Sequence, residues 1–266
     1  MPKYQGVADT LFIPLSARVH VSRRFPEYFY DGKALELEKK LPPDALLKDS
    51  AEYAMIASVA RYHNLDMMIK DFIRIHQDCN IVNLGCGLDS AYFRIGSASA
   101  MFYEIDFPDV IAQRKRLLGE TDKEILIDGD MLDMRWADGM DRTLPTLMIA
   151  SGVFQYFREE KILEFIRKAG ALFADAELAF DATNRPGLAL ANLYVRQTGN
   201  TSARMHFHVA DGQAFAKKSG TELIEQRQFF TDTRKMLAGK TRLFTRISMA
   251  IADKCGMAML LHLKLS

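Results

Sequence analysis

Two glycines near the middle of the chain are the first candidates for binding chemistry. Gly85 and Gly87 flank Cys86 directly after the apolar run 80–84, whose length and composition predict a buried strand. Glycine lets the backbone pass close to a ligand and adopt φ values that other residues avoid. Many such turns serve structure only, so the pair by itself does not separate a binding loop from an ordinary turn.

Acidic residues follow the next two apolar runs. Glu104 and Asp106 end the second run, about 20 residues after the glycines, where nucleotide-binding α/β folds place a carboxylate that accepts both ribose hydroxyls. Asp106 has the alternative role of capping the helix that begins at Pro108. Asp130 follows the third run and can accept a hydrogen bond from an adenine amino group while Met131 packs on the ring. Its alternative role is turn chemistry, because Asp-Gly is a turn dipeptide.

These positions predict an adenosine site that lacks the rest of a dinucleotide site. The third glycine of a Gly-x-Gly-x-x-Gly motif falls at Ser90, which provides no close helix approach for a pyrophosphate. Asp89 disfavours a phosphate but suits the ammonium group of a methionine-like tail. Arg61, in the helix before the first strand, can clamp that tail's carboxylate, unless it is only an exposed helix arginine. The pattern favours S-adenosylmethionine over a nicotinamide cofactor.

Strands alternate with helices along most of the chain, which predicts a doubly wound parallel sheet. In such a sheet the ligand lies at the carboxyl ends of the strands, where the candidate residues stand. We expect strands at 80–84, 101–106, 124–128, 145–150, 178–182 and 259–265, and helices at 50–76, 108–118 and 158–173. Residues 185–219 interrupt the alternation with mostly helical sequence. Leu243, Phe244, Ile247 and Ile251 mark a last amphipathic helix that stops at Gly256.

Length and composition limit the class of protein. The 266 residues suit one large core, so we expect a single domain over 1–266. A net charge of +1 gives no electrostatic reason to bind nucleic acid. The 3 cysteines fit no metal or redox spacing, and an odd number of thiols favours a reducing compartment. We find no signal peptide and no apolar run of membrane-spanning length, so we expect a cytoplasmic protein without a membrane partner.

Several segments together resemble the leucine carboxyl methyltransferase family. The runs 81–89 and 103–108 are similar to the family's signature, and the match continues, in order, through 13–18, 60–63, 129–133 and 144–150. The resemblance implies a Rossmann-like class I methyltransferase fold of about seven strands, with the last strand antiparallel. It also implies a helical cap built from residues 1–76 and from an insertion at 185–220.

The resemblance also implies roles for single residues. Arg61 matches the carboxylate clamp, Gly85 the glycine of the methionine loop, Asp106 the ribose acid, and Asp130 with Met131 the adenine contact; Arg18 falls near a basic cofactor contact. Ser151 departs from the family, because the enzymes that methylate a phosphatase carry an acid there. Residues 11–18 look more like the bacterial small-molecule branch than the phosphatase branch.

The sequence therefore predicts an S-adenosylmethionine-dependent O-methyltransferase for a small, polyketide-like carboxylate or hydroxyl. A carboxylate is ionised at neutral pH and needs no general base, whereas a hydroxyl usually does. His206 and His208 are the candidate bases, since alternation places both on one side of an extended segment. Surface or packed histidines are the simpler interpretation, and a metal site lacks a third ligand.

Aromatic residues near these positions are candidates for lining a substrate pocket, although core packing explains them equally well. They are Tyr156, Phe157, Tyr194 and Phe207. Two other functions stay open at this point. One is a catalytically silent S-adenosylmethionine-binding module, which Ser151 supports; the other is an NAD-dependent oxidoreductase, which Ser90 disfavours.

Overall fold

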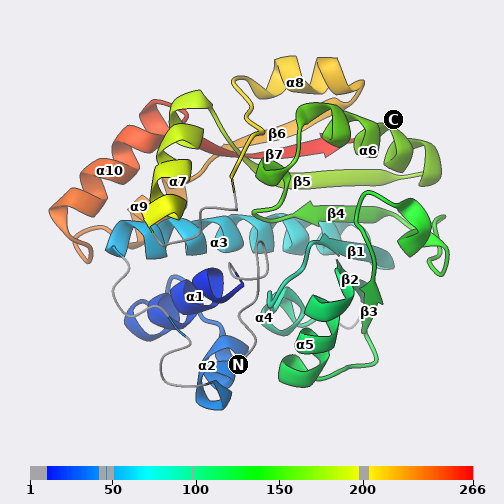
Figure 1. Cartoon of the computed structure of the whole chain (residues 1–266), viewed down its shortest axis with the longest axis horizontal. Helices are drawn as coiled ribbons and strands as arrows, with labels where there is room; N and C mark the ends of the chain where they lie inside the picture. Colours follow the sequence, from blue (N-terminus) through cyan, green and yellow to red (C-terminus); the bar gives the residue numbers. More distant parts are fainter. Residues whose placement is uncertain (1–10, 42–45, 47–50, 98, 198–203, 266) are drawn as a thin grey trace.

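The core of the molecule is a seven-stranded sheet with the order β3-β2-β1-β4-β5-β7-β6 (Figure 1). The computed structural model describes residues 11–41, 46, 51–97, 99–197 and 204–265. The strands are β1 (Cys79–Leu84), β2 (Ala100–Asp106), β3 (Glu124–Asp128), β4 (Thr146–Ala150), β5 (Ala176–Thr183), β6 (Glu222–Gln228) and β7 (Ala258–Lys264). The first five strands are parallel, and β7 pairs antiparallel with β5 and with β6. The expected doubly wound sheet with an antiparallel last strand is confirmed.

Helices cover both faces of this sheet. They are α1 (Phe12–Arg24), α2 (Gly32–Lys40), α3 (Glu52–Ile75), α4 (Ala91–Ile95), α5 (Pro108–Leu118), α6 (Glu159–Leu172), α7 (Arg185–Gln197), α8 (Gly212–Ser219), α9 (Thr231–Met236) and α10 (Leu243–Lys254). Among the described residues, no helix combines the length and the apolar character needed to cross a membrane.

Side-chain alternation along the strands builds one apolar cluster on each face. In β1, Ile81 joins the cluster beneath α3 and α10, whereas the next residue, Val82, joins the cluster beneath α6 and α8. Every residue of β1 and β4 is buried, as expected for central parallel strands covered on both sides. The sheet is therefore a rigid frame, and its carboxyl edge carries the candidate residues.

The N-terminal helices form a third, smaller cluster beside the frame. Leu15 and Val19 of α1 pack there with Ala34 and Leu37 of α2, and with Leu88 of the loop after β1. Helix α1 also lies along α3. The N-terminal segment is thus attached directly to the loop that carries the two glycines.

The later part of the chain differs from the sequence expectation in two ways. Strand β6 and helix α9 were not predicted. Within the expected insertion, α8 packs on β6 and α6 and so belongs to the layer over the sheet. The expected amphipathic helix is present as α10, and its apolar residues Leu243, Phe244, Ile247 and Ile251 lie on the exposed side.

Candidate functional site

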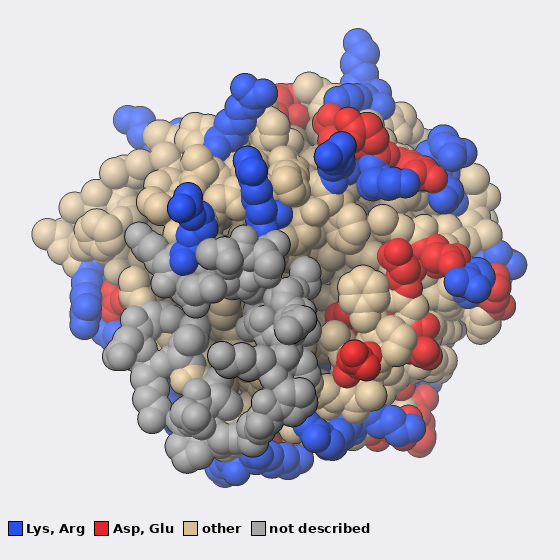
Figure 2. All heavy atoms as spheres, in the orientation of Figure 1, with Lys and Arg blue, Asp and Glu red and all other residues tan. Residues whose placement is uncertain are grey.

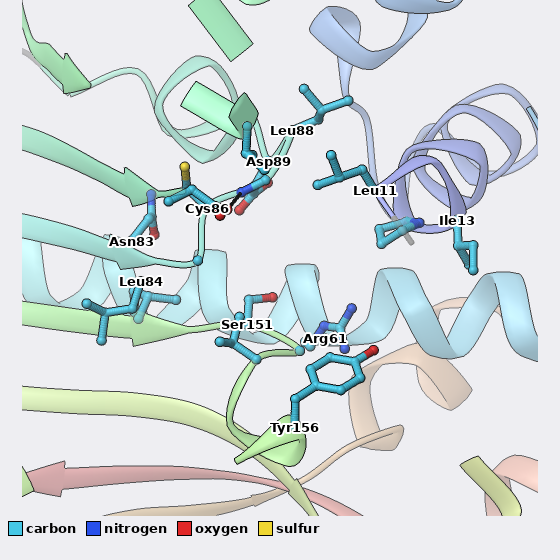
Figure 3. Close-up of a pocket in the computed structure, with 18 of the residues that line it drawn as sticks. Leu11, Ile13, Arg61, Asn83, Leu84, Cys86, Leu88, Asp89, Ser151 and Tyr156 are labelled. Atoms are coloured by element: carbon cyan, nitrogen blue, oxygen red, sulfur yellow. Dashed lines mark hydrogen bonds between the residues drawn. The ribbon is translucent and has the colours of Figure 1, made fainter. Parts of the chain in front are cut away.

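A cavity of about 790 Å³ opens at the carboxyl ends of β1, β2 and β4, between this edge, α1 and α3. In Figure 3, Arg61, Ser151 and Tyr156 lie together on one side of it, while Leu11 and Ile13 approach from the N-terminal segment. Its lining includes Arg18, Arg61, Gly85, Gly87, Asp89, Asp106, Met131, Ser151, Tyr156, Phe157 and Met205. Most of the residues expected to bind a cofactor therefore meet in one place.

The glycine loop needs glycine at both positions. Gly85 and Gly87 have φ values of 66° and 51°, in the left-handed region that side chains rarely adopt. A Cβ atom on Gly85 would lie 2.8 Å from Cγ2 of Val153. The loop can therefore bring its backbone close to Val153 and to the cavity only because both side chains are absent.

Asp106, at the end of β2, is hydrogen-bonded to the backbone of this loop. Its Oδ2 accepts a hydrogen bond of 2.8 Å from the backbone N–H of Gly87, and its Oδ1 accepts one of 2.8 Å from Phe107. The capping role is wrong, because Phe107 occupies the N-cap position of α5 and no side chain caps the helix. Burial raises the pKa of Asp106 above its usual value, against the two backbone hydrogen bonds. A ligand that donates to this carboxylate would offset that burial.

Glu104 does not reach the cavity, which corrects its assignment as a cofactor ligand. It lies in β2 two residues before Asp106 and is completely buried. Asn83 donates a hydrogen bond to it at 2.7 Å, and Arg114 lies 3.3 Å away. The Arg114 guanidinium also donates to the carbonyls of Gly87 and Asp89. Glu104 therefore supports the glycine loop through Arg114 and is unavailable to a ribose.

Met131 and Asp130 separate at the end of β3. Met131 is buried and lines the cavity, as its expected place against an adenine ring requires. Asp130 is exposed outside the cavity lining, and its side chain accepts a hydrogen bond of 2.9 Å from the N–H of Leu132. Asp130 therefore forms the turn that the sequence offered as its alternative role, outside the lining of the cavity where Met131 lies.

Arg61 projects from α3 into the cavity beside an acid that the sequence analysis missed. Its Nη1 lies 3.4 Å from Oδ2 of Asp181 in β5, and Oδ1 of Asp181 accepts a 2.6 Å hydrogen bond from the N–H of Gly152. Burial alone would lower the pKa of Arg61, but Asp181 outweighs it and the pKa is raised. The signal available in the sequence was a charged residue inside the otherwise apolar run 178–182, which was predicted as a strand.

Gly152 gives Arg61 the room that it occupies. A Cβ atom on Gly152 would lie 2.6 Å from Nη1 of Arg61, and the φ of Gly152 is 71°. The Nε atom of Arg61 is buried without a hydrogen-bond partner. The guanidinium is therefore held in place while part of its donor capacity is unused.

Arg18 lies at the wall of the cavity inside a buried charge cluster. Its Nη1 lies 2.6 Å from Oδ2 of Asp31, and its Nη2 donates to the carbonyl of Leu88 at 2.6 Å. Arg94 lies 2.7 Å from Oδ1 of Asp89 in the same cluster. Burial favours the neutral form of Asp89, but Arg94 and then Arg18 outweigh it, so the pKa of Asp89 is lowered.

This cluster changes the interpretation of both residues. Arg18 is already paired with Asp31, so its first role is to attach α1 to the loop after β1. Asp89 remains ionised next to the cavity, in the state that an ammonium group requires, although it shares its charge with Arg94.

Ser151 stands at the end of β4 between the glycine loop and Arg61 (Figure 3). Its hydroxyl oxygen is buried without a hydrogen-bond partner, and the residue lines the cavity. Tyr156, which ends the short 3₁₀ turn Phe154–Tyr156, and Phe157, which follows it, line the cavity as well. Phe207 packs in the core, and the side chain of Tyr194 lies outside the described residues.

Neither His206 nor His208, the two candidate bases, is among the residues that line the cavity. The segment alternates as expected, but Met205 turns into the cavity and Phe207 into the core. His206 is therefore exposed, and His208 accepts a hydrogen bond of 3.2 Å from Nε of Arg185. The apolar residues of this segment determine which side faces inward. Within the described part of the chain, no three His, Cys, Asp or Glu side chains are grouped to hold a metal.

Comparison with known proteins agrees with this geometry. The family model for leucine carboxyl methyltransferase matches residues 8–169. Tetracenomycin polyketide synthesis O-methyltransferase TcmP of Streptomyces glaucescens is 31% identical to this chain over 178 residues. The aligned residues make up 66% of this chain and 66% of TcmP, so the match spans just under two thirds of the length of TcmP.

Two solved structures share the fold at low identity. A DUF574 family protein from Streptomyces avermitilis has a TM-score of 0.62 at 13% identity and covers 94% of this chain and 97% of its own. Magnesium protoporphyrin IX methyltransferase from Synechocystis, solved with bound SAH, has a TM-score of 0.53 at 11% identity and covers 93% of this chain and 98% of its own.

Proposed function

Since the chain belongs to the leucine carboxyl methyltransferase family, we propose that it is an S-adenosylmethionine-dependent O-methyltransferase acting on a small molecule. The observation that carries this proposal is the meeting of the glycine loop, Asp106 and Arg61 in one cavity. The similarity to a polyketide O-methyltransferase supports a polyketide-like acceptor.

The cavity offers polar groups that fit each part of the proposed cofactor. The carboxylate of Asp106 suits the ribose hydroxyls, and Met131 suits an adenine face. The unused Nε–H of Arg61 and the unpartnered hydroxyl of Ser151 suit the methionine carboxylate. Asp89, held ionised by its arginines, suits the ammonium group. We propose that Gly85 and Gly87 contact the cofactor through their backbone atoms, and that Glu104 and Asp130 do not contact it.

S-adenosylmethionine supplies an activated methyl group when bound, so this chain has to position the acceptor and exclude water. Tyr156 and Phe157 wall the cavity next to Arg61, and Met205 covers it from the segment after α7. We propose a cap made of α1, α2 and this segment, without α8. An acceptor carboxylate agrees with this site, since it arrives ionised and neither His206 nor His208 lines the cavity.

Methyl transfer to a panel of acceptors tests the proposal. The protein is incubated with methyl-labelled S-adenosylmethionine and aromatic compounds that carry a carboxyl group, a phenol or both. We expect label in a base-labile methyl ester, and its loss in Arg61→Ala. Cofactor binding without transfer to any acceptor would favour the silent binding module, which Ser151 supports as the second candidate.

The cellular setting is part of the same proposal. The structure leaves Cys79, Cys86 and Cys255 as free thiols, and Cys79 and Cys86 are buried. Free thiols suit a reducing compartment such as the cytoplasm. The balanced total charge gives no electrostatic support for a nucleic-acid partner.

A further inference from the structure

Helix α10 presents an apolar stripe to solvent instead of to the core. The stripe consists of Leu243, Phe244, Ile247 and Ile251, which are between 49% and 74% exposed. At 3.6 residues per turn these four positions fall within an arc of about 100°. Met249 and Ala252, on the other side of the helix, are the residues that pack on the sheet. An ordinary surface helix turns its large apolar residues toward the core, whereas α10 turns four of them toward solvent.

Positive charge gathers in the same part of the chain. Residues 231–255 contain six Lys or Arg and two Asp, a net charge of +4, whereas the whole chain carries +1. Asp253 is buried and accepts from the N–H of Phe230, so it adds little negative charge to the surface. Figure 2 shows mainly blue and tan atoms at the end where α10 lies, and red atoms gathered toward the opposite end.

Three of these cations are free to meet an anionic partner. Lys235, Arg246 and Lys254 are exposed, and none of them pairs with an acid among the described residues. Lys254 falls within the arc of the stripe and Arg246 beside it. An apolar stripe with one cation at its end and another beside it fits a helix that lies in the headgroup region of an anionic bilayer.

A second copy of the chain fits this surface less well. An isologous contact through α10 would bring the cations of one copy against the same cations of the other. The most exposed side chain, Phe244, is 74% exposed and projects outward, which suits insertion among lipids. We infer that α10 docks the protein on an anionic lipid surface through Leu243, Phe244, Ile247 and Ile251. A helix of 12 residues lies on such a surface and does not span it.

The start of α10 is fixed to the helix that lines the cavity. Glu52 of α3 accepts from the N–H of Arg242 at 2.9 Å and from the hydroxyl of Thr245 at 2.7 Å. The stripe therefore keeps its outward direction without a partner. This surface role revises the expectation of no membrane partner, which rested on span length alone, and it does not depend on the proposed methyl transfer.

Vesicle flotation of the full chain tests the inference. The probes are phosphatidylcholine vesicles with and without about one quarter phosphatidylglycerol, at low and high salt. We expect binding to the anionic vesicles that falls at least about tenfold without the anionic lipid and weakens at high salt. Phe244→Gln with Ile247→Gln should reduce this binding at least about tenfold, and so should Arg246→Glu with Lys254→Glu.

Matched controls separate this surface from general stickiness. Ile75→Gln removes an apolar side chain that is 66% exposed at the end of α3, and Arg116→Glu reverses an exposed charge on α5. Both controls should bind as the unmodified protein does, with unchanged thermal unfolding. Absence of binding to anionic vesicles, or equal losses in the controls, would overturn the inference. Dimers in ultracentrifugation that dissociate in the Phe244→Gln, Ile247→Gln protein, without vesicle binding, would assign the stripe to a second copy.

Discussion

The contact between Arg61 and Asp181 is the centre of the site at the scale of single residues. Asp181 restrains one edge of the guanidinium, and the buried Nε lacks a partner. A carboxylate ligand can complete the donor set of Arg61 without displacing Asp181. Because Asp181 balances the charge of Arg61, the buried guanidinium can remain charged in the cavity before a ligand binds.

Arg61→Ala should weaken binding of S-adenosylhomocysteine by about 1.5–3 kcal/mol, because a charge-assisted hydrogen bond is lost from a buried site. The loss should be much smaller for methylthioadenosine, which lacks the amino and carboxyl groups. Calorimetric titration of both ligands measures the difference. Arg116→Ala, on the surface of α5, is the control; equal losses for the two ligands would show that Arg61 does not contact the carboxylate.

Glu104 makes a second prediction, on stability. Burial raises its pKa from 4.5 to about 7, against the attraction of Arg114, so the folded protein holds this proton more tightly than the unfolded chain. That contribution is complete below about pH 4.5 and is lost as the pH rises toward about 7. In Glu104→Gln the loss disappears, so this variant should gain stability relative to the unmodified protein between about pH 5 and 8.

Denaturant unfolding of both proteins across this pH range measures the effect. The exposed substitution Glu36→Gln is the control and should leave the pH dependence unchanged. A constant difference in the free energy of unfolding between Glu104→Gln and the unmodified protein would contradict a raised pKa for Glu104.

At the scale of elements, the loop after β1 depends on two conformations that only glycine adopts readily. Gly85→Ala places a methyl group against Val153 and retains a positive φ, so it should lower the thermal midpoint and weaken cofactor binding. Val153→Ala in the same protein relieves the contact but not the backbone strain. We expect partial recovery in a thermal melt; complete recovery would show that the conformation itself costs nothing.

In the segment 204–209, unlike at Gly85, we expect substitutions of the histidines to have little effect. His206→Ala and His208→Ala should each leave the rate of methyl transfer within about twofold, because neither side chain lines the cavity. A general base lost from the site would cost roughly 10²–10⁴-fold. Single-turnover rates between about pH 6 and 8 distinguish the cases. A large loss confined to one histidine would restore it as the base and favour a hydroxyl acceptor.

The central strands and their loops could be predicted from the sequence because buried parallel strands are short, continuous apolar runs. α5 (Pro108–Leu118) and β3 (Glu124–Asp128) have the expected bounds. β6 alternates between exposed and half-buried positions at the sheet edge, so it lacks that signal. The amphipathic helix α10 could be predicted, but its periodicity does not show which partner its apolar face meets.

The same distinction holds for the site. The position of Gly85, Gly87, Asp106 and Met131 at the cavity could be predicted because they follow predicted strands at the edge where ligands bind. Glu104 and Asp130 lie outside the cavity lining because the buried Glu104 faces Arg114 and the exposed Asp130 accepts a hydrogen bond within a turn. Asp181 was missed since its importance comes from Arg61, which is far away in sequence. The pattern of apolar and polar residues in a strand does not show which side chains from distant elements will contact one another.

At the scale of the whole molecule, the frame, the cavity and the family membership lead to one central claim, that the cavity binds S-adenosylmethionine. Isothermal titration of the purified protein with S-adenosylhomocysteine and with NAD tests it most directly. We expect one site per chain with a dissociation constant on the order of micromolar for S-adenosylhomocysteine. We expect no heat of binding for NAD, since Ser90 replaces the third glycine of a pyrophosphate loop. Binding of NAD without binding of S-adenosylhomocysteine would show that the cavity is not an S-adenosylmethionine site.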